Sequence, residues 1–223
     1  MTFSLRSSVT RAARAVGLGV LLASLSSDAA GGPEGADAVP GVGAAILAAG
    51  PRPGDVVFRR GCGLVSRVVL SSDPASTFSH VGIVVAGPGG LTVVHALPPT
   101  DASGGGVVAE PLSEFLAPRA ATAAALFRLR GRDARIGRRV AREALRLAEA
   151  GVPFDVRFDL ATGDALYCTE LVWRAYETAG VDLVAGELDA GSGRLRASSY
   201  LLPSQLEQSP HLQLIRRAEP GEV

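Results

Sequence analysis

Residues 79–96 have the sequence Ser-His-Val-Gly-Ile-Val-Val-Ala-Gly-Pro-Gly-Gly-Leu-Thr-Val-Val-His-Ala. Two runs rich in β-branched residues, 81–85 and 91–96, flank a glycine- and proline-rich segment, which is the pattern of a β-hairpin. Both runs are apolar on both faces of the strand. The hairpin is therefore expected to lie in the centre of a sheet that is covered on both sides.

Each strand of this hairpin carries a histidine near its outer end. Side chains alternate between the two faces of a strand, so a loop of even length places His80 and His95 on the same face. A two-residue loop at 87–88, or a four-residue loop at 86–89, makes them direct neighbours with Cβ atoms about 5 Å apart. Such a pair can supply a general base and the polar group that orients it. Two core histidines satisfied by backbone groups are the structural alternative.

The remaining pattern alternates short strands with helices. Further strands are expected at 55–58, 124–130 and 212–215. Helices are expected at 63–71, from Asp133 to a stop at Gly151, at 168–179, and as a short turn opened by Pro203. The sequence therefore predicts an α+β fold, with helices packed against a largely antiparallel sheet.

Cys168 is expected at the first position of the last strong helix. Backbone N–H groups and the helix dipole favour a thiolate there, so a lowered pKa is expected, and the N–H of Cys168 is a natural oxyanion donor. Two neighbours are possible supporting residues: Tyr167 through its hydroxyl, and Glu170, which suits the helix dipole. A buried structural cysteine is the alternative. Cys62 is the second of the two cysteines, and a Cys62–Cys168 disulfide would block the nucleophile.

Composition excludes several functions. Lys+Arg and Asp+Glu balance at 22 each, which leaves no electrostatic footprint for nucleic acid. All of these cations are arginine, so Schiff-base and P-loop lysine chemistry is excluded. Two histidines without an adjacent carboxylate or thiolate make a poor zinc set, so neither a metal nor another cofactor is expected.

Residues 1–30 are typical of a signal peptide. Arg6, Arg11 and Arg14 precede an apolar run at 15–25, and small residues follow. The run is shorter than the roughly 20 residues that span a bilayer. An uncleaved anchor or a buried helix is the alternative. We expect a flexible linker at 31–41, a folded domain at 42–223, and a periplasmic or extracellular protein without a stable membrane span after processing.

Four short motifs follow one another along the chain: Gly54–Phe58, Ser79–Gly82, Val94–Ala96 and Tyr167–Val172. Together they resemble the YiiX/YebB-like family, within the NlpC-type cysteine hydrolase superfamily. The resemblance covers roughly residues 50–215 and implies a circularly permuted papain-like fold, with the histidine before the cysteine in the chain.

The resemblance also implies roles for three of these residues. Cys168 matches the family's nucleophile, His80 its base, and His95 the third polar residue, which is often a carboxylate. A histidine in that place can orient His80, but it stabilises an imidazolium less well than a carboxylate does.

The implied function is an exported cysteine hydrolase of the amidase or peptidase type. A thiolate–imidazolium pair would attack an amide or ester carbonyl, most simply an amide of the cell envelope. One alternative is a lipid acyltransferase or phospholipase of the same fold, recognisable by an apolar channel that reaches the thiol. The other is a catalytically silent binding module of the envelope. The acyl acceptor and the oligomeric state stay open.

Overall fold

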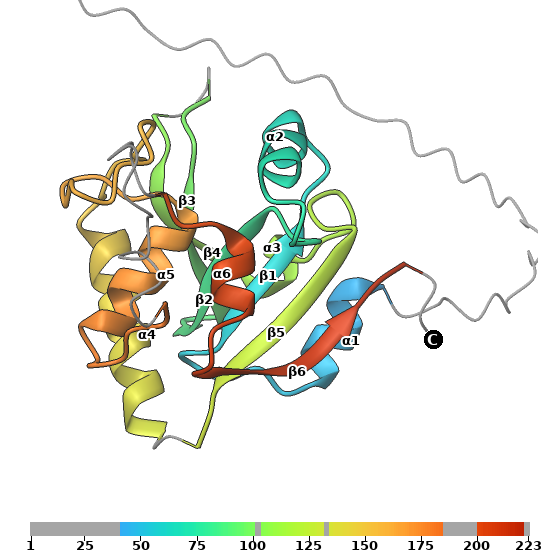
Figure 1. The fold of residues 1–223 in the computed structure, drawn as a ribbon. Helices are drawn as coiled ribbons and strands as arrows, with labels where there is room; N and C mark the ends of the chain where they lie inside the picture. The colour runs from blue at the N-terminus through green and yellow to red at the C-terminus, as the bar shows by residue number, and fades with distance from the viewer. Residues whose placement is uncertain (1–40, 101–103, 132–133, 185–199, 221–223) are drawn as a thin grey trace, which may run out of the picture. The chain divides into compact units, whose positions relative to one another are not determined.

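The computed structural model describes residues 41–100, 104–131, 134–184 and 200–220. Six strands within these residues form one antiparallel sheet in the order β4-β3-β2-β1-β5-β6 (Figure 1). The strands are β1 (Val56–Arg60), β2 (His80–Gly87), β3 (Gly90–Leu97), β4 (Gly106–Pro111), β5 (Ala123–Leu129) and β6 (Leu212–Ala218). The helices are α1 (Val42–Ala48), α2 (Leu64–Ser72), α3 (Leu112–Phe115), α4 (Ala134–Glu149), α5 (Cys168–Glu177) and α6 (Pro203–Glu207).

Apolar side chains cover both faces of the sheet. Helices α4 and α5 lie side by side and pack against β2 on one face (Figure 1), in a core that includes Val56 and Leu171. Val57 points to the opposite face, where it packs in a second core with Ile46 of α1 and Phe115 of α3. The alternation of adjacent residues between two cores explains why the strands are apolar on both sides. The predicted α+β fold is confirmed.

The central hairpin has a two-residue loop, because Gly87 pairs with Gly90. The predicted even length is therefore correct, but the loop lies one residue later than 87–88, which shifts the pairing by two residues. His80 and His95 share a face as predicted and meet diagonally, not directly across the ladder. Gly82 takes the place opposite His95, since a Cβ at Gly82 would lie 3.0 Å from the Cβ of His95.

Substituting Gly82 with alanine is expected to destabilise the protein by about 1–3 kcal/mol, the usual cost of overpacking a core. The added Cβ would lie 2.5 Å from Cγ1 of Val93 and 2.8 Å from the carbonyl oxygen of Val94. Urea unfolding measures the change. Gly89→Ala is the control in the same hairpin, because a Cβ there meets nothing within 4 Å. Equal stability of the two variants would contradict this register.

Helix α2 forms where the sequence predicts a helix, but three of its apolar side chains are exposed. Leu64, Val65 and Val68 are 74%, 57% and 66% exposed. In the part of the chain that the structure describes, no helix has the length and apolar character needed to cross a bilayer. The predicted signal peptide, and the linker up to residue 40, lie outside the described residues.

Candidate active site

A row of polar side chains crosses three neighbouring strands, β2, β3 and β4. Nε2 of His80 lies 2.8 Å from Nδ1 of His95. Nε2 of His95 in turn lies 2.9 Å from Oε1 of Glu110, although the ring N–H is not aimed straight at this oxygen. The structure therefore brings the two predicted histidines together and adds a carboxylate behind them.

The charges along this row follow from burial and from the neighbours. Burial acts to raise the pKa of Glu110, but His95 and Arg59 outweigh it, so the pKa is lowered and the carboxylate is ionised at neutral pH. Burial lowers the pKa of His95, against the opposing effect of Glu110. A neutral His95 is therefore expected beside a charged Glu110.

These charges fix one consistent arrangement of protons. A carboxylate only accepts, so the proton of His95 belongs on Nε2, facing Glu110. Nδ1 of His95 is then an acceptor, and Nε2 of His80 donates to it. This arrangement leaves Nδ1 of His80 with a free lone pair, which a general base requires.

Arg59 and Phe115 enclose the row. Nη1 of Arg59 donates to the carbonyl oxygen of Phe115 at 2.9 Å and lies 3.4 Å from Oε1 of Glu110. The guanidinium carbon lies 4.2 Å from the centre of the Phe115 ring, which also stacks on His80 with 5.8 Å between ring centres. Arg59, Glu110 and Phe115 were not predicted from the sequence. The available signals were the polar residue in β1 after its apolar run, and the acidic residue after the valines of β4.

Cys168 is the first residue of α5, and α5 packs against β2. The backbone N–H groups of Thr169, Val81 and Cys168 itself lie close enough to the sulfur to favour its thiolate. Val81 follows His80 directly in the chain. The sulfur therefore lies beside the strand that carries the candidate base.

Burial favours the neutral forms of both the thiol and the imidazole in the substrate-free protein. Burial raises the pKa of Cys168 to about 11, because it outweighs the three N–H groups and the charge of Arg59. Burial also lowers the pKa of His80 well below its usual range, and the charges of His95 and Arg59 add to this effect. The lowered cysteine pKa predicted from the helix start is thus wrong for the resting site, since the local dipole is weaker than desolvation.

Alkylation of Cys168 by iodoacetamide is expected to be slow near about pH 7 and to rise about tenfold per pH unit to beyond pH 9, since only the thiolate reacts. The rate is measured in a Cys62→Ser background, where Cys168 is the only thiol. A plateau below the ordinary thiol pKa of about 8.5, lost on His80→Ala, would instead show a resting ion pair.

The two possible supporting residues, Tyr167 and Glu170, make structural contacts. The hydroxyl of Tyr167 accepts a hydrogen bond from the backbone N–H of Leu201 at 2.7 Å. Glu170 is fully buried, with Oε1 at 3.4 Å from Nε of Arg174. Its Oε2 has no hydrogen-bond partner among the described residues. Burial raises the pKa of Glu170 to about 7, with Arg174 acting in the opposite direction.

The raised pKa of Glu170 makes stability depend on pH. Between the ordinary value of 4.5 and about 7 the folded state holds a proton that the unfolded chain has lost, so stability falls as pH rises through this window. Glu170→Gln removes the titration and is expected to stabilise the protein by on the order of 2 kcal/mol at about pH 8 and very little at about pH 5. Urea unfolding at both pH values measures this difference. A gain that is the same at both would contradict a buried, protonated Glu170.

Two pockets adjoin the site, one lined by His80 and the other by Cys168. A pocket of about 260 Å³ includes His80, Arg59, Ser66 and Ser79. A cleft of about 370 Å³ reaches Cys168 and is otherwise lined mostly by apolar residues. Cys62 lines the first of these and is exposed, and both cysteines are free thiols in the structure, so the alternative Cys62–Cys168 disulfide is not formed.

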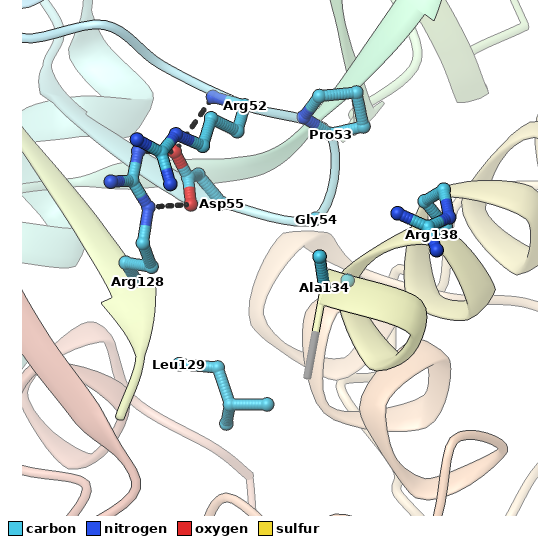
Figure 2. Close-up of a pocket in the computed structure, with 9 residues that line it drawn as sticks. Arg52, Pro53, Gly54, Asp55, Arg128, Leu129, Ala134 and Arg138 are labelled. Carbon is cyan, nitrogen blue, oxygen red and sulfur yellow. Dashed lines mark hydrogen bonds and ion pairs between the residues drawn. The ribbon is translucent and has the colours of Figure 1, made fainter. Parts of the chain in front are cut away.

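A third pocket, of about 330 Å³, shares no lining residue with these two (Figure 2). Its wall carries Asp55, which accepts hydrogen bonds from Nε of Arg128 and from the backbone N–H of Arg52, each at 2.8 Å. The charge and the hydrogen-bonding capacity of this buried carboxylate are thus satisfied by groups of the protein itself. We interpret this group as an anchor for the turn that precedes β1.

A cysteine at a helix N-terminus, packed against a strand whose histidine is oriented by further polar groups, is the arrangement of papain-like cysteine hydrolases. The chain belongs to the C92 family of permuted papain-like amidase enzymes, also called YaeF/YiiX, whose profile matches residues 51–216. The predicted family is confirmed, and with it a cysteine hydrolase of the amidase type.

One solved structure supports the fold. The crystal structure of the metalloprotein YiiX from Escherichia coli O157:H7 is 22% identical and has a TM-score of 0.61; the match covers 76% of this chain and 99% of that chain. No curated protein sequence matches significantly.

YiiX is a metalloprotein, so the residues here were compared with what a metal ion requires. Within the described ranges, no group of three or more His, Cys, Asp and Glu side chains is arranged to hold a metal ion. Nε2 of His80 and Nδ1 of His95 are hydrogen-bonded to each other, which leaves these two nitrogens unavailable as ligands. The residues of this site do not fit a metal centre.

Proposed function

We propose that the protein is an exported thiol amidase in which Cys168 is the nucleophile and His80 the general base, oriented by His95 and Glu110. The continuous row from His80 through His95 to Glu110, with distances of 2.8 and 2.9 Å, carries this proposal. A carboxylate at the end of the row supplies the charge that a histidine alone in the third place would lack.

The reaction begins from a neutral pair. As the sulfur of Cys168 attacks the amide carbonyl, its proton passes to Nδ1 of His80. Glu110 stabilises the developing imidazolium through His95. The backbone N–H of Cys168, at the start of α5, is the proposed donor to the oxyanion.

The second half returns the proton. His80 donates it to the leaving amine, the C–N bond breaks, and a thioester stays on Cys168. Water, deprotonated by His80, then attacks the thioester and releases the carboxylic acid and the free thiol. The membership in an amidase family supports an amide substrate. The signal-like segment at 1–30 supports an amide of the cell envelope.

Intact-protein mass spectrometry during turnover tests the proposal. We expect residues 31–223 to release amine from an N-acyl aminocoumarin and to carry the acyl mass on Cys168, with no acyl mass on Cys62. Cys168→Ala should lose both the adduct and the amine release. Hydrolysis that continues in Cys168→Ala would overturn the thiol mechanism. An inert wild-type protein would favour the alternative of a silent binding module.

Export has its own test. Expression of the whole chain in a bacterial host is expected to yield a protein outside the cytoplasm that begins at Gly31, as read by N-terminal sequencing. A protein that keeps Met1 and stays in the cytoplasm would overturn this part of the proposal.

A further inference from the structure

We infer that the pocket shown in Figure 2 is a binding site for a phosphate group, separate from the active site. The pocket has a volume of about 330 Å³ and is here called the arginine pocket, because Arg52, Arg128 and Arg138 lie in its wall. It shares no lining residue with the pockets of His80 and Cys168, so the inference goes beyond the proposed amide hydrolysis. Its volume lies near the lower end of the ~300–1,000 Å³ typical of small-molecule sites.

The three guanidinium groups of the arginine pocket come from three separate elements. Arg52 precedes β1, Arg128 lies in β5, and Arg138 lies in α4. Figure 2 shows Arg138 on one side of the pocket, with Arg52 and Arg128 on the other. Asp55 is the one carboxylate in the described lining. This lining therefore has a formal charge of +2, three cations less one anion, in a chain whose whole sequence is neutral.

The carboxylate of Asp55 is already committed to Arg128. Its Oδ1 accepts a hydrogen bond from Nε of Arg128 at 2.8 Å, and its Oδ2 accepts one from Nη2 of Arg128 at 2.7 Å. The same Oδ2 also accepts from the backbone N–H of Arg52 at 2.8 Å. Among the described residues, no carboxylate forms an ion pair with the side chain of Arg52 or Arg138. The N–H donors of these two guanidinium groups are therefore available to a ligand.

Helix α4 carries its charges in an order that is unfavourable for the helix alone. Residues 134–142, its first nine, contain four arginines and no acidic residue. Positive side chains near the N-terminus of a helix oppose its dipole, which is positive at that end. Arg138 and Arg142 are four residues apart and both are exposed, so their like charges repel. A bound anion would offset both effects, and a sequence that breaks such a local rule commonly does so at a functional site.

Two glycines bring α4 close to the turn that follows Arg52. A Cβ on Gly54 would lie 2.3 Å from Cα of Gly137, and a Cβ on Gly137 would lie 2.9 Å from the carbonyl oxygen of Pro53. A larger residue at either position would push the helix away from the turn. Gly137 directly precedes Arg138, so this contact holds the two arginine-bearing walls at a fixed separation. Such a preformed site binds a ligand at a lower cost in entropy.

A phosphate fits the arginine pocket better than a carboxylate does. A phosphate monoester carries a charge of about −1.5 to −2 at pH 7 and three strong acceptor oxygens, which matches the surplus of two positive charges. A carboxylate has two oxygens and one charge, and would leave one guanidinium without a counter-charge. Guanidinium groups bind phosphate through pairs of parallel hydrogen bonds. Pro53 and Leu129 add apolar surface for the organic part of the ester.

Calorimetric titration of the protein with inorganic phosphate and with glycerol 3-phosphate tests the inference. We expect saturable binding that Arg138→Gln weakens about tenfold or more, because the change removes charge-assisted hydrogen bonds. Arg52→Gln should have a similar effect from the opposite wall. Arg142→Gln is the matched control: it removes the same charge from the same helix outside the pocket lining and should change the affinity less than about twofold. No saturable binding at millimolar phosphate, or an equal loss in Arg142→Gln, would overturn the site.

Phosphatidylcholine vesicles with and without phosphatidic acid, which carries the same phosphomonoester, identify the source of the phosphate. Co-sedimentation that needs phosphatidic acid, is lost in Arg138→Gln and is competed by glycerol 3-phosphate would assign the site to a lipid headgroup. Calorimetric binding without co-sedimentation would assign it to a soluble phosphate ester.

Urea unfolding without phosphate separates binding from folding. Arg138→Gln is expected to be at least as stable as the wild type, because it removes the repulsion from Arg142. A clear loss of stability would make Arg138 a structural residue and overturn the inference.

Discussion

Replacing His80 with alanine is expected to lower kcat/KM for amide hydrolysis by on the order of 10⁴-fold near pH 7. The pKa of Cys168 is raised to about 11, so without a base only about one molecule in 10⁴ carries the thiolate at this pH. The residual rate of the variant should then rise about tenfold per pH unit, because it follows the thiolate fraction. Steady-state kinetics over a range of pH measure both effects.

The wild type should have a different profile. His80 acts as a base only when neutral, and burial holds its pKa well below 6.5. Activity is therefore expected to hold through neutral pH and to fall only in the acid range. His211→Ala is the control, since it removes the third histidine of the chain, which lies just before β6. A similar loss in both variants, or a parallel pH profile for wild type and His80→Ala, would contradict the role of His80.

Much of the fold could be predicted because its strongest signals are local. The hairpin, the strand before α2, and the helices at α4 and α5 each follow from hydrophobic periodicity and from turn residues. The missed elements α1, β4 and α3 are short, and β4 carries little pattern beyond Val107 and Val108. A strand of this kind is stabilised by pairing with β3, which is a long-range contact that the local sequence does not reveal.

The candidate site also has features that follow from the local sequence and features that depend on long-range contacts. The shared face of His80 and His95 follows from strand alternation, and it could be predicted from an even loop length. Glu110 could not, because its place beside His95 depends on the register between β3 and the unpredicted β4. The direction of the pKa shift of Cys168 could not be predicted from the sequence either. A helix start can be recognised in a sequence, whereas desolvation depends on every element that packs over the sulfur.

Glu110→Gln is expected to lower kcat by on the order of 10²-fold or more, the scale at which removal of an orienting carboxylate acts in a catalytic triad. The variant keeps the size of the side chain and removes its charge. The imidazolium that forms on His80 during attack then has no counter-charge behind His95, so the transition state loses stabilisation that the resting neutral pair does not need. The KM should change much less than kcat, because Glu110 lines neither pocket beside the site.

Glu114→Gln provides the matched control. Its carboxylate is 48% exposed and pairs with Arg119, so the same chemical change is made outside the row. Urea unfolding of both variants separates catalysis from folding: a structural role for Glu110 would lower stability and leave the kcat of the folded protein unchanged. A kcat for Glu110→Gln within a few-fold of the wild type would mean that His95 alone orients the base. This chain would then truly use a histidine where the family often has a carboxylate. The carboxylate of Glu110, one strand further along, would not take over that role.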